Sequence, residues 1–207
     1  MSSRTLTGSL LIAGTIVVVV AIIIIGSTFG NVDWGDPSEI IPLMAENAGM
    51  VKIVQPVFIL GILMVAAGYA GLNHSMSGGS SAHYMRLGLM FYLIGATVVV
   101  SESALTVGMA EAASGGNQSA AEALYAASGS IGAVGESIRF LGLALIGFSI
   151  FTQRNLPVAL GALMVVIGLI GVGTAVSSYQ SNIMIVGYGG WVILTLATGI
   201  LVLRSKD

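Results

Sequence analysis

Six long apolar stretches constrain the fold of this chain more than any other feature. Each is about twenty residues long, which is the length an α-helix needs to cross ~30 Å of hydrocarbon. Approximately, they cover Thr7–Phe29, Ile53–Leu72, Leu87–Met109, Ile131–Phe151, Leu156–Ser177 and Ile183–Leu203. Backbone groups inside a bilayer must be hydrogen-bonded within the segment, so helices are favoured even over the β-branched runs in the first stretch. The sequence predicts an all-α, polytopic membrane protein with a six-transmembrane-helix bundle.

The composition excludes most other classes of protein. Hydrophobic residues make up 56% of the chain and charged residues only 8%, whereas soluble domains carry roughly 25% charged residues. Cysteine is absent, which excludes disulfides, thiolate metal sites and cysteine nucleophiles. The net charge of −2 and the lack of a basic patch exclude nucleic acid as a partner. We therefore treat residues 1–207 as a single integral membrane domain in a lipid bilayer.

The first apolar stretch follows Arg4 and could be mistaken for a cleaved signal peptide. Its apolar core of about twenty residues is longer than the roughly 7–15 residues of a signal sequence. No clear small-x-small cleavage site follows it. We therefore expect this stretch to be the first membrane span.

The charged residues outside the spans predict the orientation of the chain. Five of the seven basic residues fall on the side that carries both termini: Arg4, Arg86, Arg154, Arg204 and Lys206. The other side carries Asp33, Asp36, Glu39, Glu46, Glu111 and Glu122, with Lys52 as its one basic residue. By the positive-inside rule, both termini are expected to be cytoplasmic.

A short helix is predicted in the first outer loop. Asp36 precedes Pro37, and Glu39 follows three residues after the aspartate. This pattern is typical of a helix start, with a capping carboxylate, a proline in the first turn and an acid near the positive end of the helix dipole. We expect an interfacial helix here, ending near Gly49, with Trp34 at the membrane surface.

The second outer loop contains the alanine-rich segment Ser119–Ser128, which favours helix. It is either a separate interfacial turn or an extension of the fourth span above the membrane. Asn117 begins an N-Q-S sequence, which matches the glycosylation acceptor pattern and lies on the predicted outer side.

Glycines recur at helical spacing within the spans. The chain has 29 of them, and many are three, four or seven residues apart, which places them on one helix face. Small residues allow membrane helices to approach closely, so these glycines predict tight packing between helices. No internal similarity indicates the inverted repeats that many transporters contain.

Three charged residues within the spans require an explanation, because a charge at mid-membrane costs roughly 2.5–3.5 kcal/mol. Glu102 lies in the third span, and Glu136 and Arg139 share one face of the fourth. Counted from the predicted span ends, Glu102 and Arg139 both lie about 12 Å deep. We therefore predict that Arg139 bridges Glu136 and Glu102, and that Gln55 and Lys52 can join from the second span.

This cluster has two interpretations. It is either an ion-pair staple that fixes the helix register, or a polar pocket, open to the outside, that binds a small ligand or relays protons. Two acids against one base leave a carboxylate in excess. No polar ladder continues toward the cytoplasmic half, so no complete conduction path is visible.

Other chemistry has little support in the sequence. His74 and His83 lie in a flexible inner loop rather than within spans, which argues against haem. With Met76 and Met85 they would suit Cu(I), but solvated loop histidines are the simpler interpretation. The glycine-rich segment Gly187–Trp191 lies inside a span, where it indicates close packing or a kink. The indole N–H of Trp191 requires a hydrogen-bond partner at this position. We expect no cofactor, no metal and no catalytic residue.

One segment resembles a family of uncharacterised six-helix bacterial and archaeal integral membrane proteins, a domain of unknown function. In that family an apolar span ends in a basic loop, and Leu-Pro-x-x-Leu-Gly opens the next span. The matching residues here are Arg154, Leu156, Pro157, Leu160, Gly161 and Gly168. The resemblance implies a six-span layout and a prokaryotic cell membrane. The family carries no assigned activity, so the resemblance implies no catalytic residue.

These observations lead to two functional hypotheses. The first is a non-enzymatic integral membrane protein that serves as a structural or accessory subunit of a larger assembly, with other membrane subunits or further copies of itself as partners. The second is a small-molecule or proton-coupled carrier that uses the intramembrane Glu/Arg cluster. A carrier requires a solvated cavity between the third and fourth spans, and a scaffold does not.

Overall fold

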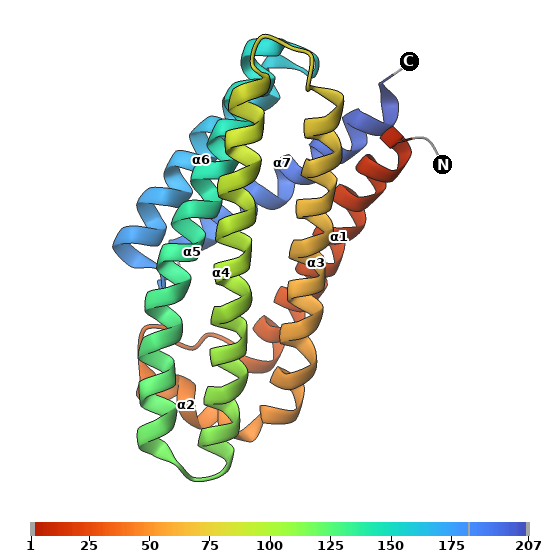
Figure 1. Cartoon of the computed structure of the whole chain (residues 1–207). Helices are drawn as coiled ribbons and strands as arrows, with labels where there is room; N and C mark the ends of the chain where they lie inside the picture. The colour runs from red at the N-terminus through yellow and green to blue at the C-terminus, as the bar shows by residue number, and fades with distance from the viewer. Residues whose placement is uncertain (1–2, 182, 206–207) are drawn as a thin grey trace.

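The computed structural model describes residues 3–181 and 183–205, and helices are the only regular secondary structure over these ranges (Figure 1). The helices are α1 (Ser3–Phe29), α2 (Pro37–Glu46), α3 (Ala48–Ser75), α4 (Ala82–Ser114), α5 (Gln118–Gln153), α6 (Val158–Ser178) and α7 (Met184–Arg204). All except α2 are long and apolar enough to cross a membrane. The predicted six-span helical bundle is confirmed, and the chain is an integral membrane protein. Lys206, which contributed to the predicted orientation, lies outside the described residues.

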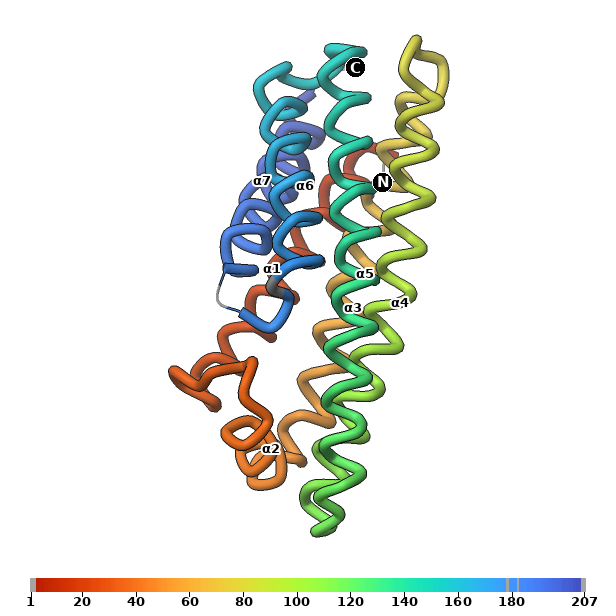
Figure 2. The backbone as a smooth tube through the Cα atoms, turned by 90° about the vertical axis from the view of Figure 1, so that its left-hand side faces the viewer, coloured from red at the N-terminus to blue at the C-terminus, as the bar shows by residue number. Residues whose placement is uncertain are grey.

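The six long helices form a closed ring in chain order. Each packs against its neighbour in the series α1, α3, α4, α5, α6, α7, and α7 packs back against α1. Both termini lie at one end of the bundle, with the α3–α4 and α5–α6 connections, and we call this the terminal end (Figure 1). The opposite end carries α2 and the α4–α5 turn, and we call it the α2 end. The α6–α7 connection stops well short of that turn (Figure 2).

Glycines allow neighbouring helices to approach closely, as predicted. A Cβ atom on Gly95 of α4 would lie 2.5 Å from the backbone nitrogen of Arg139 on α5, and one on Gly88 would lie 2.8 Å from that of Ile146. These separations are shorter than van der Waals contact, so a larger residue would push the helices apart. Similar close approaches occur at Gly14 and Gly61 between α1 and α3, at Gly147 and Gly161 between α5 and α6, and at Gly8 and Gly199 between α1 and α7.

Helices α4 and α5 form a hairpin that is longer than a membrane is thick. Their 33 and 36 residues span about 50 Å at 1.5 Å per residue, against roughly 30 Å of hydrocarbon. Gly116 turns the chain with a φ of +75°, which favours glycine. The Asn117 side chain then caps α5 by accepting hydrogen bonds from Ala120 N at 3.2 Å and Ser119 Oγ at 3.3 Å. The segment Ser119–Ser128 is therefore an extension of the fourth span and not a separate turn.

The short helix α2 begins as predicted. The Asp36 carboxylate accepts hydrogen bonds from Ser38 N at 2.8 Å and from Ser38 Oγ at 2.7 Å. Together these hydrogen bonds hold the pKa of Asp36 below its usual value. The apolar face of α2 packs against the α4–α5 hairpin, through Ile40, Ile41 and Met44 on one side and Met109, Ala110 and Ala121 on the other. This packing fixes α2 across the end of the bundle.

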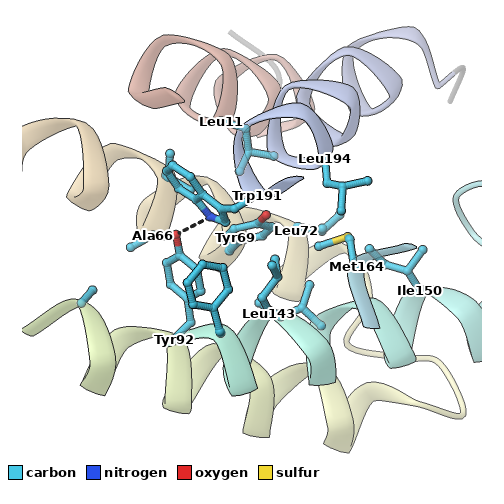
Figure 3. Close-up of a cluster of buried hydrophobic side chains, with 14 of the residues drawn as sticks. Leu11, Ala66, Tyr69, Leu72, Tyr92, Leu143, Ile150, Met164, Trp191 and Leu194 are labelled. Atoms are coloured by element: carbon cyan, nitrogen blue, oxygen red, sulfur yellow. Dashed lines mark hydrogen bonds between the residues drawn. The ribbon is translucent and has the colours of Figure 1, made fainter. Parts of the chain in front are cut away.

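Aromatic side chains fill the centre of the ring toward the terminal end (Figure 3). Tyr69, Tyr92 and Trp191 are completely buried there. The indole N–H of Trp191 donates a hydrogen bond to Tyr92 Oη at 3.2 Å, which is the partner that its position within a span requires. The hydroxyl groups of Tyr69 and Thr195 lie 3.0 Å apart. The centre of this half of the ring is therefore packed, and the polar groups of these three aromatic side chains are paired.

Candidate functional site

A large cavity lies between the helices near the α2 end. Its volume is about 1070 Å³, and residues of α1, α3, α4, α5 and α7 line it. The cavity is therefore bounded by five long helices and does not lie between the third and fourth spans alone, α4 and α5, where the carrier hypothesis placed it. Aliphatic and aromatic side chains make up most of the wall, including Val19, Ile22, Val54, Phe58, Met184 and Val192. Ile40 and Met44 of α2 and Trp34 of the preceding loop line it as well. The cavity is thus an apolar chamber that α2 partly covers.

The charged residues on the wall are all acidic. Glu102 of α4 and Asp33 of the α1–α2 loop line the cavity, and no lysine or arginine of the described ranges does. The remaining polar lining includes Gln55, Tyr179 and Tyr188. An apolar cavity with a few polar groups has the character of a small-molecule site.

Glu102 has one anchored and one open carboxylate oxygen. The hydroxyl of Tyr179, which follows α6, donates a hydrogen bond to Oε1 at 2.5 Å. Within the described part of the chain, Oε2 has no hydrogen-bonding or ion-pair partner. Gly132 of α5 leaves space for the Tyr179 ring, because a side chain there would collide with it. The carboxylate is therefore held in place while keeping an acceptor for another molecule.

Glu136 and Arg139 form a salt bridge next to the cavity. Arg139 Nε donates to Glu136 Oε2 at 2.8 Å, and Nη2 lies 2.6 Å from the same oxygen without hydrogen-bond alignment. Both side chains are almost completely buried, at 0% and 1% exposure. Tyr188 lines the cavity and donates its hydroxyl to Glu136 Oε1 at 2.7 Å. Tyr188 therefore connects the cavity to the buried ion pair.

Aromatic rings surround the guanidinium of Arg139. Its Cζ lies 4.7 Å from the ring centroid of Trp191, 5.2 Å from Phe140, 5.6 Å from Tyr188 and 5.7 Å from Tyr92. These distances are within the range of cation–π attraction. Its Nη1 also donates to Tyr92 Oη at 3.4 Å. Glu136 and the aromatic rings together compensate the buried positive charge.

The predicted bridge between Arg139 and Glu102 does not form, and the helix register explains why. Gly95 packs directly against the backbone of Arg139. Glu102 follows seven residues later, about 10 Å further along α4 toward the α2 end. The prediction placed both residues at one depth because it assumed that the spans ended near residues 110 and 131. The hairpin turn at residues 115–117 sets a different register.

The other two predicted residues separate as well. Lys52 Nζ lies 2.8 Å from Glu111 Oε1, and both side chains are about half exposed on the surface of the bundle. Lys52 therefore takes no part in the buried cluster, contrary to the prediction. Gln55 lines the cavity together with Glu102. Of the five predicted residues, Glu102 and Gln55 line the cavity, Glu136 and Arg139 form a buried ion pair, and Lys52 lies on the surface.

Sequence reasoning missed the three tyrosines that connect these residues. Tyr179 and Tyr188 each donate to a carboxylate, and Tyr92 accepts from Arg139 and Trp191. The available signal was their position, because a hydroxyl within or beside an apolar span requires a partner.

No cluster of three or more histidine, aspartate or glutamate side chains that could hold a metal ion occurs in the described ranges. His74 and His83 are exposed near the α3–α4 connection. Comparison of the chain with protein-family models, with curated proteins and with solved structures gives no match.

Proposed function

We propose that this protein is a carrier that binds a small organic molecule in the cavity at the α2 end. The proposal includes an orientation, with the α2 end outside a prokaryotic cell membrane and both termini in the cytoplasm. The cavity is the observation that carries it. Its volume of about 1070 Å³ is slightly above the roughly 300–1,000 Å³ that is usual for small-molecule sites.

The packing at the terminal end supports a carrier in one of two alternating states. Tyr69, Tyr92 and Trp191 close the centre of the ring there, with no exposed surface. A molecule in the cavity has access to the α2 end and none to the other. Carriers alternate between such a state and its opposite, so release to the terminal end requires these rings to separate.

An accessory subunit remains the competing proposal. It predicts a stable complex with other membrane proteins or a second copy of the chain, and a chamber closed to water. The cavity favours the carrier, because a bundle that serves only as a scaffold gains nothing from an unfilled interior.

The experiment uses the absence of cysteine, since one introduced cysteine gives a unique label. Thr106 and Thr97 lie on α4, and each donates its hydroxyl to a carbonyl four residues earlier. Thr106 lines the cavity, whereas Thr97 is exposed on the surface of the bundle. We expect Thr106→Cys to react with a membrane-impermeant, positively charged methanethiosulfonate added outside intact cells, and Thr97→Cys, which faces lipid, to remain unmodified.

A second control reports the orientation. Ser80 is exposed in the α3–α4 connection, so Ser80→Cys should react only after the cells are opened. If Thr106→Cys and Thr97→Cys are equally protected from the methanethiosulfonate, the carrier proposal is overturned and the accessory-subunit proposal is favoured. Labelling of Ser80→Cys in intact cells would overturn the proposed orientation.

A further inference from the structure

We propose that the cavity binds an amphipathic organic cation, an ammonium group carried on an apolar body. This inference rests on the proposed function and names its substrate class. Glu102 binds the ammonium head, and the aliphatic wall near α1 and α7 accepts the apolar body.

The balance of charge around the cavity determines the sign of the ligand. Glu102 and Asp33 are its acidic lining residues, and no basic residue of the described part of the chain offsets them there. Glu136 neutralises Arg139, and Lys52 pairs with Glu111. When Glu102 is ionised, its negative charge therefore has no counter-charge among the side chains that line the cavity. In surroundings of low dielectric constant, that charge attracts a cation and repels an anion.

The local geometry of Glu102 suits an ammonium group. Tyr179 fixes Oε1, which leaves Oε2 as an acceptor on the wall of the cavity. The rings of Tyr179 and Tyr188 also line the chamber. Aromatic faces attract ammonium and quaternary ammonium groups. A carboxylate beside aromatic rings therefore provides both charge and surface for such a head.

The shape of the wall explains why the ligand has an apolar body. Helices α1 and α7 pack closely at Gly8 and Gly199, toward the terminal end. Nearer the α2 end, Ile23 of α1 and Ile185 of α7 both line the cavity, yet they are 61% and 66% exposed. The cavity is therefore open between α1 and α7 on a surface that faces lipid. An amphiphile can enter there with its hydrocarbon part still in the bilayer.

A matched set of three amphiphiles tests the inference. (11-Bromoundecyl)trimethylammonium, 11-bromoundecanol and 11-bromoundecanoate share one brominated chain and differ in the charge of the head. Bromine quenches tryptophan, and Trp34 lines the cavity. The chain has only two tryptophans, so Trp191→Phe leaves Trp34 as the single reporter. The protein is reconstituted in phosphatidylglycerol nanodiscs, and quenching is measured against the concentration of each amphiphile.

We expect saturable quenching by the cation, at a concentration about tenfold or more below that of the alcohol, and no saturation by the carboxylate. Glu102→Gln keeps an acceptor for Tyr179 but removes the charge, so it should weaken binding of the cation to the level of the alcohol. Glu122→Gln is the matched control, because Glu122 is an exposed acid on α5 outside the cavity. It should leave the binding unchanged.

The outcomes separate the inference from the proposed function. Equal saturable binding of cation and alcohol, unaffected by Glu102→Gln, would overturn the cationic ligand and leave a binding cavity. Absence of saturation by all three, in protein with an unchanged melting temperature, would overturn both.

A final experiment distinguishes two possible ligands that both carry an ammonium group: a lipid headgroup and a free amphiphile. In nanodiscs that contain phosphatidylethanolamine, a lipid ammonium headgroup would compete with the probe and weaken its binding. Unchanged binding would assign the cavity to a free amphiphile.

Discussion

The two halves of the helical ring differ in their packing, although the same helices form both: one half has a filled centre and the other contains a cavity. Toward the terminal end, glycines bring the backbones together, and Tyr69, Tyr92 and Trp191 fill the centre. Toward the α2 end, α1 and α7 separate and leave a cavity of about 1070 Å³. The first arrangement is expected of a membrane bundle held by close packing, whereas the second leaves an open space between the helices.

The carboxylates of Glu136 and Glu102 show the difference between the two halves at the level of single residues. Glu136 is fully satisfied, because Arg139 binds one of its oxygens and Tyr188 the other. Glu102 is satisfied at one oxygen, by Tyr179. A carboxylate with both oxygens paired and a carboxylate with one oxygen paired thus lie on adjacent helices.

The largest effect should come from breaking the ion pair. Arg139→Leu leaves Glu136 buried without its counter-charge, and loss of one partner of a buried pair costs about 3–5 kcal/mol. The melting temperature of the purified protein in detergent measures this loss. The double variant Glu136→Leu/Arg139→Leu removes both charges and should regain most of the stability. A double variant as unstable as Arg139→Leu would show that packing of the arginine, rather than charge balance, holds this half together.

A smaller loss should follow from adding one carbon atom to a close helix contact. In Gly95→Ala the new Cβ would lie 2.5 Å from the backbone of Arg139, and overpacking of this kind costs about 1–3 kcal/mol. Gly173→Ala is the control, because nothing lies within 4 Å of a Cβ at that position in α6. Thermal unfolding of both variants compares a packed glycine with an open one, and equal melting temperatures would contradict the assigned role.

A still smaller effect on stability is expected at the cavity. Tyr179→Phe removes the hydrogen bond to Glu102 Oε1, but the carboxylate faces the cavity, where water can replace the donor. We expect a loss of about 1 kcal/mol or less, with weaker binding of the bromoalkyl ammonium probe because the carboxylate is no longer held in place. If this variant unfolds as readily as Arg139→Leu, Glu102 is structural and the contrast between the halves fails.

The smallest effect concerns the start of α2 and its dependence on pH. The folded-state pKa of Asp36 is lowered by hydrogen bonds from Ser38, so its contribution to stability is present above the usual aspartate pKa near 4. That contribution is lost as the pH falls through the lower folded-state value. Trp34 fluorescence of the Trp191→Phe variant should therefore change below about pH 4.

Asp36→Asn supplies the control for this titration. Asparagine also caps helices but does not ionise, so this variant should lose the part of the acid transition that Asp36 contributes. An identical transition in both proteins would assign the change to other carboxylates.

The sequence predicted the elements of the fold better than the relations between them. Twenty-residue apolar stretches are sufficient to identify spans, because only helices satisfy their own backbone in lipid. The Asp36-Pro37 start of α2 was predictable for a similar local reason. The register between α4 and α5 was not predictable in this way, because it depends on the turn at Gly116. The sequence did not show where in the loop the chain turns. Because the turn between α4 and α5 was predicted at the wrong position, Arg139 was predicted to lie at the depth of Glu102.

The cavity could not be predicted from the sequence at all. It results from the angle between α1 and α7 and from the early end of α6, which are properties of the assembled ring. The tyrosine contacts depend on the same assembly. Tyr188 and Glu136 are 52 residues apart in the chain, and Tyr179 and Glu102 are 77 apart. The residues of the site were therefore visible as unusual polar positions, whereas their partners were not.

The contact between α1 and α7 joins two spans that lie far apart along the chain. Chains fold from the N-terminus during synthesis, so α5 carries Glu136 and Arg139 into the bilayer before α7 exists. Until then the carboxylate lacks Tyr188 and the guanidinium lacks the Trp191 ring. Arrival of α7 supplies both and closes the ring at Gly8 and Gly199. Completion of the charged centre therefore waits for the synthesis of α7, and a nascent chain that stops short of α7 holds an ion pair that lacks these two partners.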